Sequence, residues 1–162
     1  RQRQMCIRDS TRRVVHLDIK PANIMYLPQY HGLKITDFGV AHFMGIHNND
    51  ETVLGSPSYM SPEQLLKKSI DGRSDLYSLG CVLYQLISGS LPFNGKNLQT
   101  LIKKIVREPH THLSMILPDI PECIDYVVNI ALAKDPKDRF QSGEEMAIAL
   151  RDCKGEMQDM ER

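Results

Sequence analysis

Side chains with complementary chemistry lie close together near the start of the chain. Asp18, Lys20 and Asn23 fall within six residues, and fourteen residues further on a second carboxylate, Asp37, precedes Phe-Gly. Pro21 lies inside the first group, and because proline fixes φ and removes a backbone N–H, this stretch is predicted to be a stiff loop. A carboxylate can accept a proton, an ammonium can meet a phosphate, and an amide with a carboxylate can hold Mg²⁺. The set therefore suits phosphoryl transfer.

A predicted β-hairpin would bring the two halves of this set together. Residues 24–27 form a short apolar run, residues 33–36 alternate as a strand does, and a turn pattern covers 29–32 between them. Asn23 comes just before the first strand and Asp37 just after the second. Antiparallel pairing should therefore place these two candidate metal ligands side by side.

Helical patterns dominate the rest of the chain. Ser61 and Gln64 predict a capping box, and residues 76–87, apolar on nearly every face, predict a buried core helix that ends at Gly89. Three amphipathic helices should follow, around residues 98–106, 124–132 and 146–153, the last opening with a second capping box at Ser142–Glu145, and a proline-containing loop separates the first two. The predicted fold class is α+β, mainly helical, with a small hairpin and a buried central helix. In contrast, residues 40–60 show no helical period, which is typical of a functional or mobile segment.

Bulk composition narrows the class of protein. The chain has 162 residues, 41% of them apolar, a formal net charge of zero and a pI of about 7.2, which gives no case for binding nucleic acid or an anionic membrane. No apolar run reaches the roughly 18 residues of a membrane span, and no signal peptide is visible. Cys6, Cys81, Cys123 and Cys153 are widely spaced, which predicts a reduced, cytoplasmic chain with buried thiols, while a membrane anchor in the full-length parent stays open.

In order and spacing, five groups of residues resemble the C-terminal lobe of Hanks-type protein kinases. The sequences in and around these groups are similar to those of the bacterial serine/threonine members. These groups are His16–Asn23, Asp37–Gly39, Ser61–Glu63, Asp75–Gly80 and Arg139. The resemblance covers residues 14–152. Residues 1–13 are expected to be unstructured or foreign to the domain, with a basic arm for an anionic partner as the alternative, and residues 153–162 to be a frayed polar tail.

The resemblance implies a role for each polar residue of the first set. Asp18 would accept or orient the proton of the substrate hydroxyl, and Lys20 would neutralise the γ-phosphate of ATP. Asn23 and Asp37 would hold Mg²⁺. ATP and Mg²⁺ are the implied cofactors, and serine and threonine residues of proteins are the implied substrates.

The resemblance also implies structural and regulatory residues. Glu63 would form a buried ion pair with Arg139, and Asp75 would accept hydrogen bonds from the backbone of the catalytic loop. Residues 40–60 would be the activation segment. Thr52 and Ser56 are the candidate phosphorylation sites in it, and Ser56 sits where relatives place a hydroxyl that contacts Asp18 and Lys20.

Two departures from the family pattern matter. Leu17 stands where relatives usually carry the arginine that meets a phosphorylated activation segment, so that form of regulation loses its cationic partner. No glycine-rich loop or Val-Ala-Ile-Lys strand precedes residue 14. The sequence therefore resembles a fragment without the lobe that grips ATP, and weak or no activity is expected of it alone.

Other interpretations stay open at this point. A pseudokinase or docking module without catalysis, and a small-molecule phosphotransferase of kinase-like fold, are the two alternative functions. A basic helix face, which comprises Lys103, Lys104 and Arg107, is either a solvated surface or a partner-docking site. His110 and His112 could form a metal pair, but a solvent-facing location is the simpler prediction, and His16 is predicted to be structural, packed near Phe38.

Overall fold

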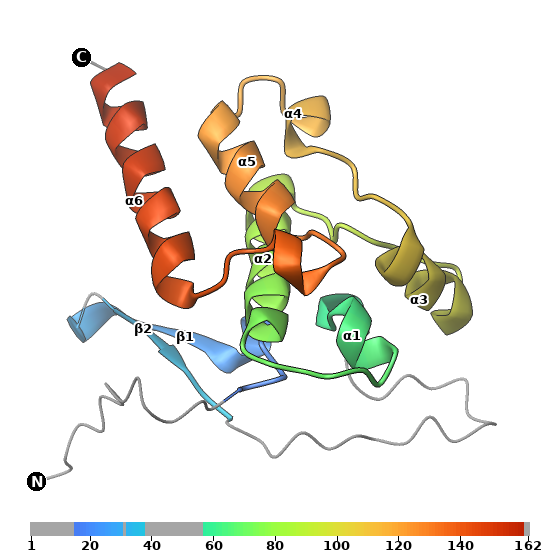
Figure 1. Ribbon diagram of the computed structural model, residues 1–162. Helices are drawn as coiled ribbons and strands as arrows, with labels where there is room; N and C mark the ends of the chain where they lie inside the picture. The colour runs from blue at the N-terminus through green and yellow to red at the C-terminus, as the bar shows by residue number, and fades with distance from the viewer. Residues whose placement is uncertain (1–14, 31, 38–56, 161–162) are drawn as a thin grey trace, which may run out of the picture.

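The computed structural model describes residues 15–30, 32–37 and 57–160 of the chain. In that part, a two-stranded antiparallel hairpin lies beside a helical body (Figure 1). The hairpin consists of β1 (Ile24–Leu27) and β2 (Gly32–Ile35), paired so that Ile24 faces Ile35. The predicted hairpin and the mainly helical α+β composition are both confirmed.

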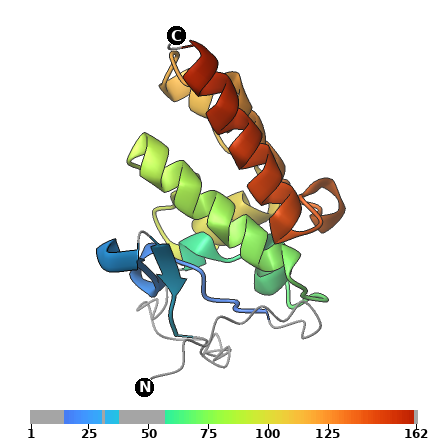
Figure 2. The ribbon, with the colours of Figure 1, turned by 90° about the vertical axis from the view of Figure 1, so that its left-hand side faces the viewer.

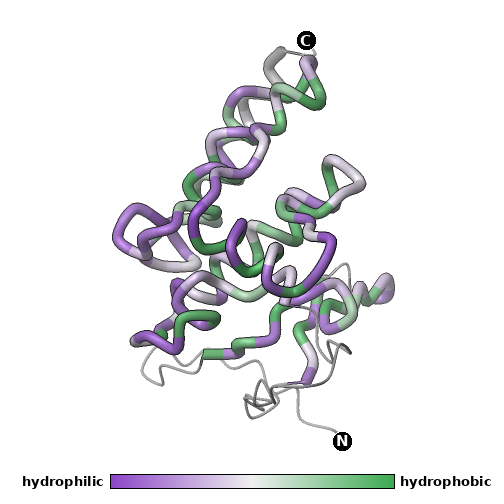
Figure 3. Tube along the Cα trace, turned by 90° about the vertical axis from the view of Figure 1, so that its right-hand side faces the viewer, coloured by the Kyte–Doolittle hydropathy of each residue, from purple (hydrophilic) through white to green (hydrophobic). Residues whose placement is uncertain are grey.

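The helical body has one central helix, and the other helices, among them a second long one at the C-terminus, lie around it (Figures 1 and 2). The described α-helices are α1 (Pro62–Leu65), α2 (Arg73–Ser88), α3 (Leu98–Arg107), α4 (Leu113–Ile116), α5 (Glu122–Ala131) and α6 (Gly143–Met160). Short 3₁₀ turns are η1 (Pro21–Asn23), η2 (Pro28–Tyr30), η3 (Pro57–Tyr59) and η4 (Pro136–Asp138). Figure 3 shows hydrophobic and hydrophilic residues intermixed along the helices, as expected of helices with one face in a core.

The central helix α2 is the buried helix that the sequence predicts. Tyr77, Cys81 and Tyr84 are buried on it and join residues from α3, α4 and α5 in the main apolar cluster. Gly89 ends the helix with a φ of 73°, a left-handed conformation that glycine adopts at little cost. Burial is less complete near this end, where Leu86 is 72% exposed.

The helices α2 and α5 pack tightly at a glycine. A Cβ atom built on Gly80 would lie 2.8 Å from the Cβ of Ala131, so no other residue fits between the two helices without movement. Ala131 is itself fully buried. The contact therefore fixes how deeply α5 packs against the central helix.

Three details differ from the sequence-based expectations. The proline-containing loop after α3 includes a one-turn helix, α4. At the start of α6, Ser142 accepts from the N–H of Glu145, as in a capping box, but the Glu145 carboxylate accepts from the N–H of Gln141 instead of Ser142. The polar segment 153–162, expected to be frayed, is helical as far as Met160.

A disulfide bond corrects the prediction of free thiols. Cys123 at the start of α5 is bonded to Cys153 in α6, thirty residues later. The two cysteines lie far apart in the sequence, and only the packing of α6 beside α5 brings them together. Cys81 is free and buried, as expected, and burial raises the pKa of its thiol to about 12.

Several sequence-based predictions lie outside the described residues. These are the N-terminal segment 1–13, the residues Phe38 and Gly39, and the candidate phosphorylation sites Thr52 and Ser56. The end of the segment predicted to lack regular structure is described, and it forms η3. No helix in the described ranges is long and apolar enough to cross a membrane.

Candidate active site

The loop before β1 has little regular structure and is held by side chains. Pro21 opens η1, and the N–H of Asn23 closes this turn by donating to the carbonyl of Lys20 at 2.9 Å. Proline suits this position because its missing N–H would have no partner in the first turn. The turn η1 thus agrees with the stiff loop that Pro21 indicates in the sequence.

Asp18, Lys20 and Asn23 meet around one carboxylate. Lys20 Nζ lies 2.8 Å from Asp18 Oδ2, and Asn23 Nδ2 donates to the same oxygen at 2.9 Å. Asn23 Nδ2 also donates to the backbone carbonyl of Asp18 at 2.8 Å. The Asn23 side chain is buried, whereas the side chain of Asp18 is 49% exposed, so the carboxylate is accessible to another molecule.

The hairpin brings the backbone that leads into Asp37 up to Asn23 of this cluster. Thr36 donates from its N–H to the carbonyl of Asn23 at 2.9 Å, one step beyond the last strand pair. His16, which is buried, bonds through Nε2 to the carbonyl of Thr36 at 2.9 Å. Asp37 follows directly, with a φ of 54° that turns the chain out of the strand. The ends of the hairpin that carry Asn23 and Asp37 thus lie side by side in the backbone, as expected from antiparallel pairing of the two strands.

The first turn of α2 anchors the loop from below. Asp75 accepts from the N–H of His16 at 2.7 Å and from the N–H of Leu17 at 2.8 Å. Burial raises the pKa of Asp75, and these two hydrogen bonds offset only part of that rise. The prediction that Asp75 accepts from the loop backbone is confirmed.

Glu63 and Arg139 form a buried, bidentate ion pair. The Arg139 Nη1 and Nη2 atoms lie 2.7 and 2.8 Å from the two carboxylate oxygens of Glu63. Ser74 adds a third hydrogen bond to the carboxylate at 2.6 Å. Burial alone would raise the pKa of Glu63, but the hydrogen bonds from Arg139 and Ser74 outweigh it, and the pKa falls below its ordinary value. The predicted ion pair is confirmed, and it ties α1 to the segment after α5.

The histidine pair after α3 is only partly exposed. His112 is exposed, but His110 is half-buried with its ring edge-on to Tyr84 and Phe93. The two rings stack with their centres 5.6 Å apart, and the Asn129 amide bridges them, with Oδ1 2.7 Å from His110 Nε2 and Nδ2 2.8 Å from His112 Nδ1. No group of three or more potential metal ligands was found among the described residues. The prediction that both histidines face solvent is therefore wrong for His110.

Sequence reasoning missed the part played by Lys134. Its Nζ donates to the carbonyl of Ile105 at 2.7 Å, near the C-terminal end of α3, and lies 3.8 Å from the ring centre of Phe93. Burial lowers the pKa of Lys134 to about 8. A cation at a helix C-terminus satisfies carbonyls that have no partner within the helix. In the sequence, Lys134 lies at the start of a polar turn that contains a second lysine, Lys137, and no local signal distinguishes it.

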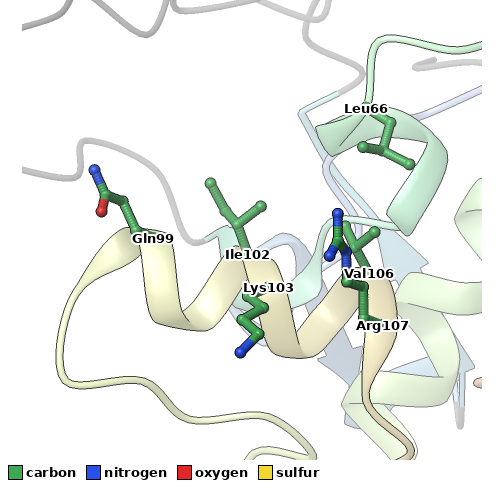
Figure 4. A pocket seen from close by; sticks show the side chains of 6 residues that line it. All are labelled: Leu66, Gln99, Ile102, Lys103, Val106 and Arg107. Atoms are coloured by element: carbon green, nitrogen blue, oxygen red, sulfur yellow. The ribbon is translucent and has the colours of Figure 1, made fainter.

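A shallow groove runs between α1 and the outer face of α3 (Figure 4). Its volume is about 430 Å³. The residues that line it are Leu66, Gln99, Ile102, Lys103, Val106 and Arg107. Two of the three basic residues singled out in the sequence thus border an apolar depression, whereas Lys104, half-buried, does not line it.

The arrangement can orient one hydroxyl group and one anion at the same place. The half-exposed Asp18 carboxylate can accept a proton, and the Lys20 ammonium beside it can face a developing negative charge. Both are held by a loop whose backbone is bonded to α2 and whose end is fixed by the hairpin. Such pre-positioned charge is what phosphoryl transfer requires of a protein.

The sequence and its relatives define the class of this protein. The protein kinase domain profile matches residues 10–149, and the chain belongs to that family.

Bacterial serine/threonine-protein kinases are among the relatives of the chain. The chain is 41% identical over 144 residues to a probable serine/threonine-protein kinase of Streptomyces coelicolor, which covers 86% of this chain and 21% of the relative. It is 40% identical over 141 residues to the serine/threonine-protein kinase PknB of Mycolicibacterium smegmatis and to PknB of Mycobacterium tuberculosis, with 85% of this chain and 22% of each relative covered. The chain thus spans about a fifth of the length of these relatives.

Proposed function

We propose that this chain is the C-terminal lobe of a serine/threonine protein kinase and that its loop transfers the γ-phosphate of ATP to serine and threonine hydroxyls of proteins. The observation that carries the proposal is the cluster of Asp18, Lys20 and Asn23 around one accessible carboxylate. The bacterial relatives, which are named as serine/threonine-protein kinases, support the same class of reaction.

Each residue of the cluster has a distinct task in this proposal. Asp18 accepts or orients the hydroxyl proton of the protein substrate, since its carboxylate is half-exposed and fixed from behind by Asn23. Lys20, paired with Asp18 in this structure, exchanges that partner for the phosphate oxygens that gain charge during transfer. Because ATP and Mg²⁺ are abundant in the cytoplasm, we place the activity there.

The donor chemistry of Asn23 and Asp37 fits Mg²⁺. The Nδ2 atom of Asn23 donates to two oxygens of Asp18, and the opposite amide orientation would set Asn23 Oδ1 against those oxygens. The Oδ1 atom is therefore the oxygen that Asn23 offers to a cation. Together with the Asp37 carboxylate it gives the oxygen ligands that Mg²⁺ prefers, and the ion when bound would neutralise charge on the ATP phosphates.

A comparison of variants tests the proposed reaction. The full-length protein that contains this chain is incubated with Mg·ATP and a protein substrate, and phosphate incorporation is compared with that of Asp18→Ala. Loss of general-base catalysis should lower the rate by about 10²–10⁴-fold. The control is Asp119→Ala, which removes an exposed carboxylate between α4 and α5 and should leave the rate unchanged. Equal incorporation by the wild type and Asp18→Ala would refute the proposal.

We further propose that the groove between α1 and α3 docks a protein partner. Leu66, Ile102 and Val106 give it an apolar floor, and Lys103 and Arg107 make its rim basic (Figure 4). This combination suits a peptide with apolar and acidic side chains. The double variant Lys103→Glu/Arg107→Glu should raise KM for a protein substrate that carries such a peptide and leave KM for ATP unchanged. An unchanged KM for the protein substrate would remove the groove from the proposal.

A further inference from the structure

Leu17, the residue before Asp18, has an unusual backbone conformation. Its φ is 62°, in the left-handed region that residues with a Cβ atom seldom adopt. A residue held there persists only when its surroundings fix it. The conformation of Leu17 sets the direction in which the chain enters Asp18, so whatever holds Leu17 also orients the candidate base.

Side chains from two different helices hold the backbone of Leu17. Asp75 of α2 accepts from the Leu17 N–H at 2.8 Å. Gln64 of α1 donates from Nε2 to the Leu17 carbonyl at 3.1 Å, across 47 residues of sequence. The other polar atom of that same peptide group, the N–H of Asp18, donates to His16 Nδ1 at 3.2 Å. Both polar atoms of the peptide that leads into Asp18 are therefore bonded to side chains.

The orientation of the Gln64 amide follows from the start of α1. Its Oε1 atom accepts from the N–H of Ser61 at 3.0 Å and from the hydroxyl of Ser61 at 3.1 Å. A backbone N–H needs an acceptor, so Oε1 must face Ser61, and Nε2 is then the atom that faces Leu17. One side chain thus completes the capping box of α1 and donates to the catalytic loop.

We propose that Gln64 is a positioning residue for Asp18, acting through the carbonyl of Leu17. This inference rests on the proposed function, because it assigns Gln64 to the same site. Gln64 is more than a helix-capping residue here, since a glutamate would complete the capping box equally well and has no N–H to donate to Leu17. The amide nitrogen is needed only for the contact with the loop.

Two substitutions separate capping from positioning. Gln64→Glu keeps an acceptor for Ser61 and removes the donor to Leu17. Ser61→Ala removes the hydroxyl that caps α1 and leaves the Gln64 amide facing Leu17. Both variants are made in the full-length protein, and kcat, the two KM values and Tm are measured. The backbone carbonyl shift of Leu17 and the amide shift of Asp18 are measured by NMR.

The two variants should differ in kcat. For Gln64→Glu we expect kcat to fall by about three- to tenfold, KM for ATP to stay the same, and both NMR shifts to move. For Ser61→Ala we expect Tm to fall at least as much, with kcat within about twofold of the wild type. Gln64→Met, which keeps the side-chain volume, should reproduce the kcat loss if the carboxylate of Gln64→Glu prevents folding.

Clear outcomes would overturn the inference. A wild-type kcat in both Gln64→Glu and Gln64→Met would show that the contact with Leu17 does not position Asp18. A kcat that falls in proportion to Tm in Ser61→Ala as well would assign the effect to helix stability. Failure of the proposed function would be recognised separately, because the wild type itself would then show no phosphorylation that depends on Asp18.

Discussion

Removal of Glu63 should destabilise the fold far more than removal of an ordinary surface charge. The side chain of Arg139 is fully buried, and Glu63 accepts two of its hydrogen bonds. Arg139 also donates to the carbonyls of Arg73, Ala133 and Lys134. In Glu63→Ala the guanidinium keeps these three carbonyls but loses its counter-charge, and a buried charge without its partner costs about 3–5 kcal/mol.

The companion variant Arg139→Ala should cost at least as much. It leaves the Glu63 carboxylate with Ser74 as its remaining side-chain donor. The three backbone carbonyls also lose the hydrogen bonds that Arg139 donates to them. The double variant should cost less than the sum of the two single ones, because each single variant includes the penalty of an uncompensated charge. Since the pKa of Glu63 is lowered from 4.5, the stability that the pair contributes is present above that pH and is lost as pH falls through the folded-state pKa.

Urea unfolding at pH 7, followed by circular dichroism, measures these differences. The control is Arg151→Ala, which breaks an ion pair with Glu144 whose two side chains are 62% and 74% exposed. Exposed pairs contribute about 0.2–1 kcal/mol, so the control should barely shift the midpoint. A loss below 1 kcal/mol in Glu63→Ala would refute the reasoning, because the buried pair would then behave like a surface pair.

Three further predictions concern the helical body. Reduction of the Cys123–Cys153 bond, or Cys153→Ser, should lower the free energy of unfolding by about 3–4 kcal/mol, since the bond closes a loop of thirty residues, and urea unfolding with and without dithiothreitol checks this. The pKa of Lys134 is lowered from 10.5 to about 8, so between pH 8 and pH 9 the unfolded chain binds the proton of this lysine more tightly than the folded protein, and the free energy of unfolding should rise with pH. In Lys134→Met this rise should be missing, and an identical pH profile in both proteins would contradict the assignment. Tyr77→Phe should leave Tm unchanged or raise it by a few degrees, because the buried hydroxyl of Tyr77 has no hydrogen-bond partner among the described residues; a fall of more than 5 °C would reveal a missed partner.

Local signals were sufficient for most of the elements and for the polar loop. The proline of η1, the alternation of β2 and the apolar run of α2 each act within a few residues, and the structure has all three elements. Asp18, Lys20 and Asn23 fall within six residues of one loop, so their spacing in the sequence already implied that the three side chains lie close together.

Contacts between distant segments were harder to predict. The pairing of Glu63 with Arg139 and the anchoring of the loop by Asp75 were expected only through the family resemblance, because nothing local requires them. The Cys123–Cys153 bond and the contact of Lys134 with the end of α3 were not anticipated. Both depend on how α5 and α6 pack on the rest of the body, and side-chain type alone does not specify that packing.

Gly80 limits the residue types that can occupy the contact between α2 and α5. A methyl group there would lie 2.8 Å from the Cβ of Ala131, whereas carbon atoms in ordinary contact are about 3.5–4.0 Å apart, so α5 would have to retreat by roughly 1 Å. Arg139 donates to the carbonyls of Ala133 and Lys134 just after α5, so we expect a shift of α5 to disturb the 2.7 Å bond from Arg139 to Glu63. The absence of a side chain at Gly80 thus sets the spacing of α2 and α5, on which the ion pair of Glu63 and Arg139 depends.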